Sequence, residues 1–330
     1  MKEESAKRVW SHIGMVLCVL LWGLAPLAGK YLFDEGAYSP ALLIALRGAV
    51  SVLLMGLFLL LTGRFRKLNK SYWICLPAGL ILGSAYLFQF IGLESTALSK
   101  NTFLESFSVI AVPLSIWILT RKRPGIASAL ASVLCLAGAF VLCGNGMDFS
   151  ALFTTPTLGE AFSAIGGLLF GVNIAFTKVF VKDKDPFLYV FIQLLVMTVI
   201  SFAYALPFEK GLAYSFEFRH ILVLLFLAVI CTVGCWILRT VSIKRVSAIT
   251  CAVLNPMSAV IATILSISLS FEPFSWNVIV GGAIILLAVF LSGIYDALEE
   301  KRHAHKREAP SLEMESSQDS RASASTDSPD

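Results

Sequence analysis

The sequence predicts an all-α integral membrane protein with ten transmembrane helices arranged as two inverted five-helix repeats. Three observations lead to this fold class: an apolar composition, ten stretches free of charged residues, and an internal repeat. Of the 330 residues, 57% are hydrophobic and 15% are charged, whereas about 25% are charged in typical soluble proteins. The composition therefore excludes a soluble globular enzyme.

Ten stretches free of Asp, Glu, Lys and Arg define the expected helices. They cover residues 9–29, 48–63, 71–93, 106–120, 124–147, 161–177, 186–208, 220–238, 246–271 and 273–295. Seven of them have 19 residues or more, which is enough for a helix to cross a hydrocarbon core of about 30 Å. The other three reach that length only if Arg47, Glu105 and Lys178 lie inside the membrane.

The number of Lys and Arg residues alternates between high and low from one connecting segment to the next. Twenty of them fall in every second connection, including the run Arg239, Lys244 and Arg245, and in the parts of the two terminal segments next to the helices, residues 2–8 and 301–307; three fall in the connections between. Because basic segments stay on the cytoplasmic side, we expect a multi-pass protein of the cell membrane with both termini in the cytoplasm. The net charge of +4 reflects this topology. We therefore expect membrane lipid, and no nucleic acid, as a partner.

An internal repeat relates the two halves of the chain. A shift of 148 residues aligns Leu21, Trp22, Gly23 and Lys30 with Leu169, Phe170, Gly171 and Lys178. Five spans is an odd number, so the second half enters the membrane from the opposite side. Inverted repeats of this kind are typical of alternating-access transporters, which bind solute near the midplane between the halves. The expected domains are a cytoplasmic segment 1–11, a first repeat 12–143, an external linker 144–157, a second repeat 158–295 and a cytoplasmic tail 296–330, basic and then disordered.

Small residues and prolines inside the expected spans predict local features of helix packing. Gly79 with Gly83, and Gly167 with Gly171, have the GxxxG spacing that allows close helix contact. Three prolines within spans predict kinks. They are Pro26, Pro113 and Pro256.

Several short patterns carry a resemblance to a known family. They are Trp22 and Gly23 followed by Lys30, Ser39, Pro40 and Arg47; Ser99, Lys100, Asn101, Thr102 and Phe103 leading to Val112 and Pro113; residues 124–138; and residues 247–256 followed by Phe271, Glu272 and Pro273. Over residues 12–296 the chain resembles a pair of EamA-type modules of the drug/metabolite transporter superfamily. One departure is that Arg121, Lys122, Arg123 and Pro124 stand where many members carry a Glu.

The resemblance implies a ten-helix secondary transporter of a small organic metabolite or drug-like solute, often an exporter. Relatives carry amino acids, nucleotide sugars, amines and phosphorylated sugars, so family membership does not choose the substrate. The expected partner is thus a small-molecule solute. The oligomeric state stays open, a homodimer included.

Charged side chains inside the membrane are the first candidates for binding solute. Arg47 and Glu105 lie at matching depths of about 10 Å and about 9 Å from the outer surface, by helical rise. They form either a structural salt bridge or a functional pair, in which Arg47 attracts a carboxylate or phosphate and Glu105 takes up a proton or a cationic group. Lys30 either binds solute or extends its amine to the interface.

The second repeat aligns neutral residues with this pair. The candidates from the second repeat, Asn173, Gln193 and Asn255, offer hydrogen bonds to a solute. Trp22, from the first repeat, either lines the pathway or serves in packing. The full set of expected substrate-binding residues is Arg47, Glu105, Lys30, Asn173, Gln193, Asn255 and Trp22.

No catalytic or cofactor motif is found in the sequence. It lacks a GxxxxGK[ST] phosphate loop, HExxH and GxSxG, and its cysteines form no CxxC pair. We therefore expect no enzyme activity, no cofactor and no metal. The leading hypothesis is a secondary transporter, proton-coupled or an exchanger. The alternatives are a membrane enzyme acting on a lipid-linked substrate, a channel, or a non-transporting sensor.

Overall fold

The computed structural model describes residues 2–96, 98–121, 123, 125–143, 157–209, 213–268, 274 and 276–291. Within these residues the regular secondary structure is entirely helical. Most of the expected linker 144–157, Pro124, Glu272 and the tail beyond residue 291 lie outside the described residues.

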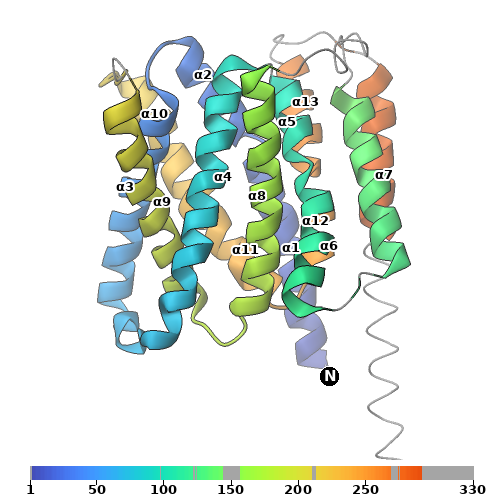
Figure 1. Ribbon diagram of the computed structural model, residues 1–330, viewed down its shortest axis with the longest axis horizontal. Coiled ribbons are helices and arrows are strands. Elements are labelled where there is room, and N and C mark those ends of the chain that lie inside the picture. Colours follow the sequence, from blue (N-terminus) through green and yellow to red (C-terminus); the bar gives the residue numbers. More distant parts are fainter. Residues whose placement is uncertain are drawn as a thin grey trace, which may run out of the picture.

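The helices of the first repeat follow one another in an up-and-down order (Figure 1). They are α1 (Lys2–Trp22), α2 (Ala25–Asp34), α3 (Pro40–Leu61), the 3₁₀ turns η1 (Arg64–Lys67) and η2 (Lys70–Ile74), α4 (Cys75–Ser95), α5 (Leu98–Glu105), α6 (Ser108–Thr120) and α7 (Ile126–Cys143).

The second repeat has the same succession of spans. Its helices are α8 (Leu158–Phe180), α9 (Pro186–Phe208), α10 (Phe218–Phe226), the π-helical segment η4 (Leu227–Gly234), α11 (Cys235–Ile243), α12 (Ala248–Leu254), α13 (Met257–Ser268) and a last helix at Trp276–Leu291.

Eight helical segments of the described chain are long and apolar enough to cross a membrane. Two shorter apolar helices, Ala129–Leu142 and Trp276–Leu291, stand at the expected fifth and tenth spans. Together they confirm the predicted ten-helix membrane fold. The inversion is visible in Figure 1, where α1 begins at the lower end of the bundle and α8 begins at the upper end.

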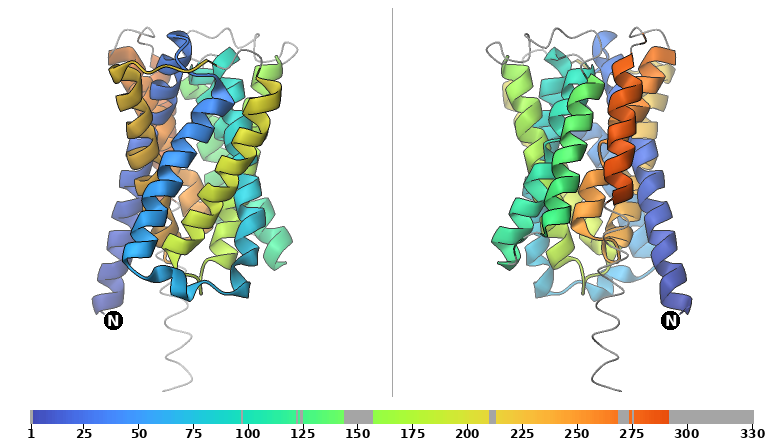
Figure 2. Two further views of the ribbon diagram at one scale, coloured as in Figure 1. Left: turned by 90° about the vertical axis from the view of Figure 1, so that its left-hand side faces the viewer. Right: turned by 90° about the vertical axis from the view of Figure 1, so that its right-hand side faces the viewer.

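The contacts between helices follow the same inverted symmetry. The third span of each half packs on the first span of the other, so that α4 contacts α8 and α11 contacts α1. The equivalent helices α3 and α9 pack against each other, and α7 lies beside the helix 276–291 (Figure 2). The two repeats are therefore interlocked.

The two ends of the bundle differ in charge. We call the end that carries Arg64, Lys67, Lys182 and Lys184 the basic end, which is the lower end in both views of Figure 2. The other end carries Glu209, whose carboxylate accepts hydrogen bonds from the Ser39 hydroxyl at 2.7 Å and from two backbone N–H groups at the start of α3. We call it the Glu209 end.

Three spans are interrupted by short turns instead of forming continuous helices. The first breaks at Gly23 and Leu24, the fourth at Ser106 and Phe107, and the ninth at Asn255 and Pro256. The prolines at positions 26 and 256 lack a backbone N–H, which explains the first and third breaks. In the second, hydrogen bonds tighten to the 3₁₀ pattern, with Ser106 N–H donating to the Phe103 carbonyl. Pro113, by contrast, lies inside α6, which continues past it.

Glycines of α8 bring it close to the break in the fourth span. A Cβ atom added at Gly167 would lie 2.9 Å from the Glu105 Cα, and one at Gly171 would lie 2.6 Å from the Ser108 carbonyl oxygen. Real Cβ atoms do not approach other atoms so closely. The contact predicted from the GxxxG spacing is therefore confirmed, and it fixes the backbone on either side of the break.

Candidate binding cavity

A cavity lies where the three broken spans meet. Its empty space is about 720 Å³, including the part that opens to solvent. Residues at or next to all three breaks line it, among them Trp22, Glu105 and Asn255. Helix breaks leave backbone groups without their helical partners, and membrane proteins tolerate this where the backbone faces a cavity.

Arg47 reaches the cavity from α3 and is 1% exposed. Its Nε donates a hydrogen bond to the Thr232 hydroxyl at 3.1 Å. Its guanidinium carbon lies over the rings of Tyr86 and Phe90, at 4.6 and 5.3 Å from their centroids. Its Nη1 is buried and has no hydrogen-bond partner among the described residues. The charge is thus held by rings and one hydroxyl, and one donor is free for a ligand.

Arg239 is the second buried cation of the cavity, and the expectation that it belongs to a cytoplasmic loop is wrong. It lies in α11, which continues to Ile243, and the residue is 2% exposed. The charge-free stretch ended at residue 238 only because Arg239 itself closed it. The guanidinium lies 4.4 Å from the Trp236 ring centroid, and Nη1 donates to Asn173 Oδ1 at 3.3 Å. Its Nε is buried without a partner among the described residues.

Glu105 lies at the end of α5 and is paired with a neutral residue. Its carboxylate accepts a hydrogen bond from Gln89 Nε2 at 2.5 Å. The described structure contains no ion pair between Glu105 and Arg47, although both line the cavity. Of the two alternatives left open by the sequence, the structural salt bridge is therefore absent, and both charged groups face the cavity separately.

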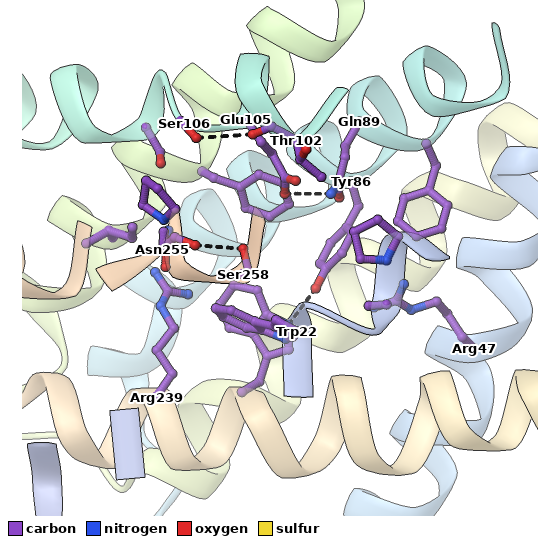
Figure 3. Close-up of a pocket in the computed structure, with 18 residues that line it drawn as sticks. Trp22, Arg47, Tyr86, Gln89, Thr102, Glu105, Ser106, Arg239, Asn255 and Ser258 are labelled. Carbon is purple, nitrogen blue, oxygen red and sulfur yellow. Dashed lines mark hydrogen bonds between the residues drawn. The ribbon is translucent and has the colours of Figure 1, made fainter. Parts of the chain in front are cut away.

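Aromatic side chains separate the two arginines. Trp236 Nε1 donates to the Tyr86 hydroxyl at 2.8 Å, and the centroids of these rings lie 6.1 Å apart. Trp22 packs on Trp236 at 5.4 Å and donates from Nε1 to the Cys231 carbonyl at 2.9 Å. Figure 3 shows Arg47 and Arg239 entering from opposite sides, with Trp22 and Tyr86 between them and Glu105 toward the top of the view. The polar groups of the rings are satisfied, so their faces remain as an apolar surface.

The π-helical segment η4 forms hydrogen bonds with several side chains at and near the cavity. Its carbonyls at Ala228 and Cys231 accept hydrogen bonds from Ser51 Oγ and Trp22 Nε1. Thr232, which holds Arg47, donates to the Leu227 carbonyl at 2.7 Å, five residues earlier. An extra residue in a helical turn frees carbonyls for other partners, and such segments are frequent at functional sites.

Four of the seven predicted binding residues line the cavity, and three do not. Arg47, Glu105, Asn255 and Trp22 are in the lining. Asn173 lies behind it, where it orients Arg239 and donates to the Ala78 carbonyl at 3.0 Å.

Lys30 and Gln193 are away from the cavity lining. The Lys30 amine reaches the Glu94 carbonyl at 3.3 Å and Asp34 at 3.4 Å, because it lies near the Glu209 end of its helix. Gln193 is fully buried between α9 and α4, and its side-chain amide has no hydrogen-bond partner among the described residues.

Several lining residues were missed by the sequence argument. Tyr86, Gln89 and Phe90 share one face of α4 at helical spacing, and two polar side chains on one face of an apolar span are a signal for a cavity. Arg239 carried a weaker signal, because Thr240, Val241, Ser242 and Ile243 after it contain no further charge. A count of charged residues alone discards both signals.

Among the described residues, the lining carries two arginines and one glutamate as its charged side chains. No group of three or more His, Cys, Asp or Glu that could hold a metal occurs among the described residues. Neither arginine has a carboxylate partner there. Such a cavity favours the binding of an anionic group.

Comparisons with known proteins agree with this architecture. The EamA-like transporter family matches twice, over residues 9–144 and 157–294. An "Uncharacterized transporter" of Archaeoglobus fulgidus is 23% identical over 290 residues, which is 87% of each chain. One solved crystal structure of a protein has a TM-score of 0.70 at 18% identity and covers 86% of this chain and 98% of that chain, which shows the fold alone. On the double family match, the chain belongs to the EamA-like transporter family, with two copies of the EamA domain.

Proposed function

We propose that the protein is a secondary active transporter that carries a small organic solute by alternating access through this cavity. The observation that carries the proposal is the meeting of three broken spans around buried charged groups. Discontinuous helices at the interface of inverted repeats are the usual site of solute binding in secondary transporters.

The proposed roles follow from the contacts. Arg47 binds a carboxylate or phosphate of the solute through its free Nη1. Asn255 and the aromatic rings orient the rest of the molecule. The basic end lies in the cytoplasm, in keeping with the retention of Lys and Arg on that side.

Glu105 is the proposed proton carrier. The charged and titratable groups around it are Arg47, Tyr86 and Arg239 in the cavity wall, and the Lys100–Glu160 ion pair that joins α5 to α8. None of these groups forms an ion pair with Glu105 among the described residues, so its carboxylate is free to exchange a proton with the cavity.

The test begins with the purified protein in detergent and a metabolite library. A ligand that binds only the folded state raises the melting temperature by mass action. A solute found in this way is then loaded into proteoliposomes to measure counterflow and proton movement. Saturable counterflow supports a transporter, and its absence with every bound ligand would contradict transport and favour a sensor.

The proton role is tested with Glu105→Gln. This variant keeps the size of the side chain and loses the proton site, so we expect counterflow without dependence on a pH gradient. Glu94→Gln is the matched control, because the Glu94 side chain is exposed outside the cavity. Unchanged pH coupling in Glu105→Gln would remove Glu105 from the mechanism.

A further inference from the structure

The two arginines of the cavity occupy separate anion positions. Arg47 is fixed by Thr232, Tyr86 and Phe90, whereas Arg239 is fixed by Asn173 and Trp236. The hydrogen-bonded pair of Tyr86 and Trp236 stands between them. Since each guanidinium is held by its own partners on its own side of this pair, the two do not converge on one acidic group.

Each position has an unused donor. Arg47 Nη1 and Arg239 Nε are buried and without a hydrogen-bond partner among the described residues. A buried cation without a counter-charge is costly, and an unpaired donor on it adds to that cost. Glu105, the only carboxylate among the described lining residues, is bound to Gln89 and forms an ion pair with neither arginine. Both arginines therefore lack a counter-charge among the described residues, and an acidic group of a bound ligand would supply it.

The surface between the two positions is apolar. The faces of Trp22, Tyr86, Phe170 and Trp236 form it, and the polar atoms of three of these rings are engaged by protein groups. A ligand that spans from one arginine to the other has to present carbon to these rings. Planar or aliphatic segments satisfy this condition.

From this geometry we infer that the transported solute is an organic dianion, with one acidic group on Arg47, a second on Arg239, and an apolar segment across the rings between them. The inference rests on the proposed function and specifies its substrate class. It also joins the two halves of the protein, since Arg47 belongs to the first repeat and Arg239 to the second.

The experiment compares acids that share a carbon skeleton and differ by one acidic group. Terephthalate is paired with benzoate, and adipate with hexanoate. Binding is followed by calorimetry and by tryptophan fluorescence in the detergent-purified protein. Two of the six tryptophans, Trp22 and Trp236, line the cavity, while the other four are exposed on the outer surface, so ligand-dependent quenching reports on the cavity.

At least one dianion is expected to bind about tenfold or more tightly than its monoanion, the effect of one added charge-assisted contact. Arg47→Gln and Arg239→Gln should each remove this advantage while leaving the monoanion bound. Arg219→Gln is the control, because Arg219 is exposed at the Glu209 end and pairs with Glu35. If a glutamine variant does not fold, Arg47→Lys and Arg239→Lys replace it, and each should reduce the advantage by loss of the planar fork.

The outcomes separate this inference from the proposed function. The inference that the solute is a dianion is overturned if dianions and monoanions bind with equal affinity. It is also overturned if the tighter binding of the dianion survives in both arginine variants. Counterflow of a neutral or cationic solute, with no binding of either anion class, also overturns the dianion inference but still supports the proposed transport function. Dianion binding without counterflow supports the site assignment and contradicts transport.

Discussion

At the scale of single residues, Asp185 begins a helix and joins the two repeats. Its carboxylate accepts a hydrogen bond from the Phe187 N–H at 3.0 Å, which caps α9, and it pairs with Arg64 at 2.9 Å and Lys67 at 3.2 Å from the first repeat. Burial raises the pKa of this carboxyl, but the Phe187 hydrogen bond and the contacts with Lys67 and Arg64 outweigh burial and hold the pKa below its usual 3.8.

The contribution of Asp185 to stability is therefore expected to depend on pH. A lowered pKa in the folded state means that the contribution is complete above pH 3.8 and is lost as the pH falls through the folded-state pKa. Asp185→Asn keeps a capping group and loses the ion pairs, so it should lower stability by less than about 1 kcal/mol. Asp185→Ala should cost about 0.5–2 kcal/mol more through the lost cap.

The measurement is the melting temperature in detergent between pH 3 and 7. The gap between the parent and Asp185→Asn should close toward pH 3. Asp183→Asn, an exposed neighbour, should follow the parent at every pH. A gap that stays constant down to pH 3 would show that the ion pairs do not stabilise the folded state.

The sequence predicted two of the three charged residues that line the cavity, Arg47 and Glu105, and missed Arg239. Arg47 and Glu105 were found because each interrupts a span that is otherwise too short, and the structure brings both to the cavity. Arg239 was missed because it lies near the end of a long apolar stretch, where a charge is usually in the loop. Contacts such as Arg239 with Asn173 join residues 66 positions apart, and their pairing depends on the tertiary fold.

At the scale of helices, charge patterns predicted the ends of spans where acidic or basic residues flank them. The stretch 186–208 coincides with α9 because Asp185 and Glu209 bound it. Breaks inside spans were predictable where proline supplies the cause, as at Pro26 and Pro256. The break at Ser106 and Phe107 has no proline, and the π-helical segment has no sequence signature. Both result from packing and hydrogen bonding between helices.

The contact of α8 with the break in the fourth span gives a prediction for Gly167→Ala. The added Cβ would meet the Glu105 Cα and carbonyl oxygen, each at 2.9 Å, and these are backbone atoms that cannot move aside alone. We expect a loss of about 1–3 kcal/mol of stability together with reduced transport, because α5 carries Glu105. Melting temperature and counterflow measure the two effects.

Gly56→Ala is the matched control for this helix contact. Its nearest neighbour would be Phe191 Cε2 at 3.5 Å, an ordinary contact, so its stability should stay within about 0.5 kcal/mol of the parent. Equal melting temperatures for the two variants would mean that α5 and α8 move apart at no cost, and that α8 does not position Glu105.

At the scale of the whole molecule, the inverted repeat was predictable because its signals are local. Lys30 aligns with Lys178, and the structure gives the two lysines equivalent roles. Lys30 donates to the Glu94 carbonyl at the end of the third span, and Lys178 donates to the Ile243 and Val246 carbonyls at and just after the end of the eighth. The charged cavity breaks this symmetry, since Arg47 aligns with Gln193 and Arg239 aligns with no charged residue. The internal symmetry therefore predicts the arrangement of the helices but not the ligand that the cavity binds.

The asymmetric charge of the cavity predicts how the carrier returns when it is empty. Alternating access requires a stage in which the cavity is closed to both sides and water is largely excluded. An empty cavity then encloses two guanidiniums without anions, and each buried ion without a partner costs several kcal/mol. A bound dianion supplies both partners, so the loaded carrier should change its access more readily than the empty one.

Exchange should accordingly be faster than net movement of solute. Since each 1.36 kcal/mol changes a rate about tenfold, we expect counterflow in proteoliposomes to exceed net efflux by at least about tenfold. Arg239→Gln removes one of the two buried charges and should narrow this ratio, whereas Arg219→Gln, on the exposed rim, should preserve it. Equal rates of counterflow and net efflux in the parent protein would mean that the empty cavity closes without penalty, and that its arginines are neutralised by a group other than the solute.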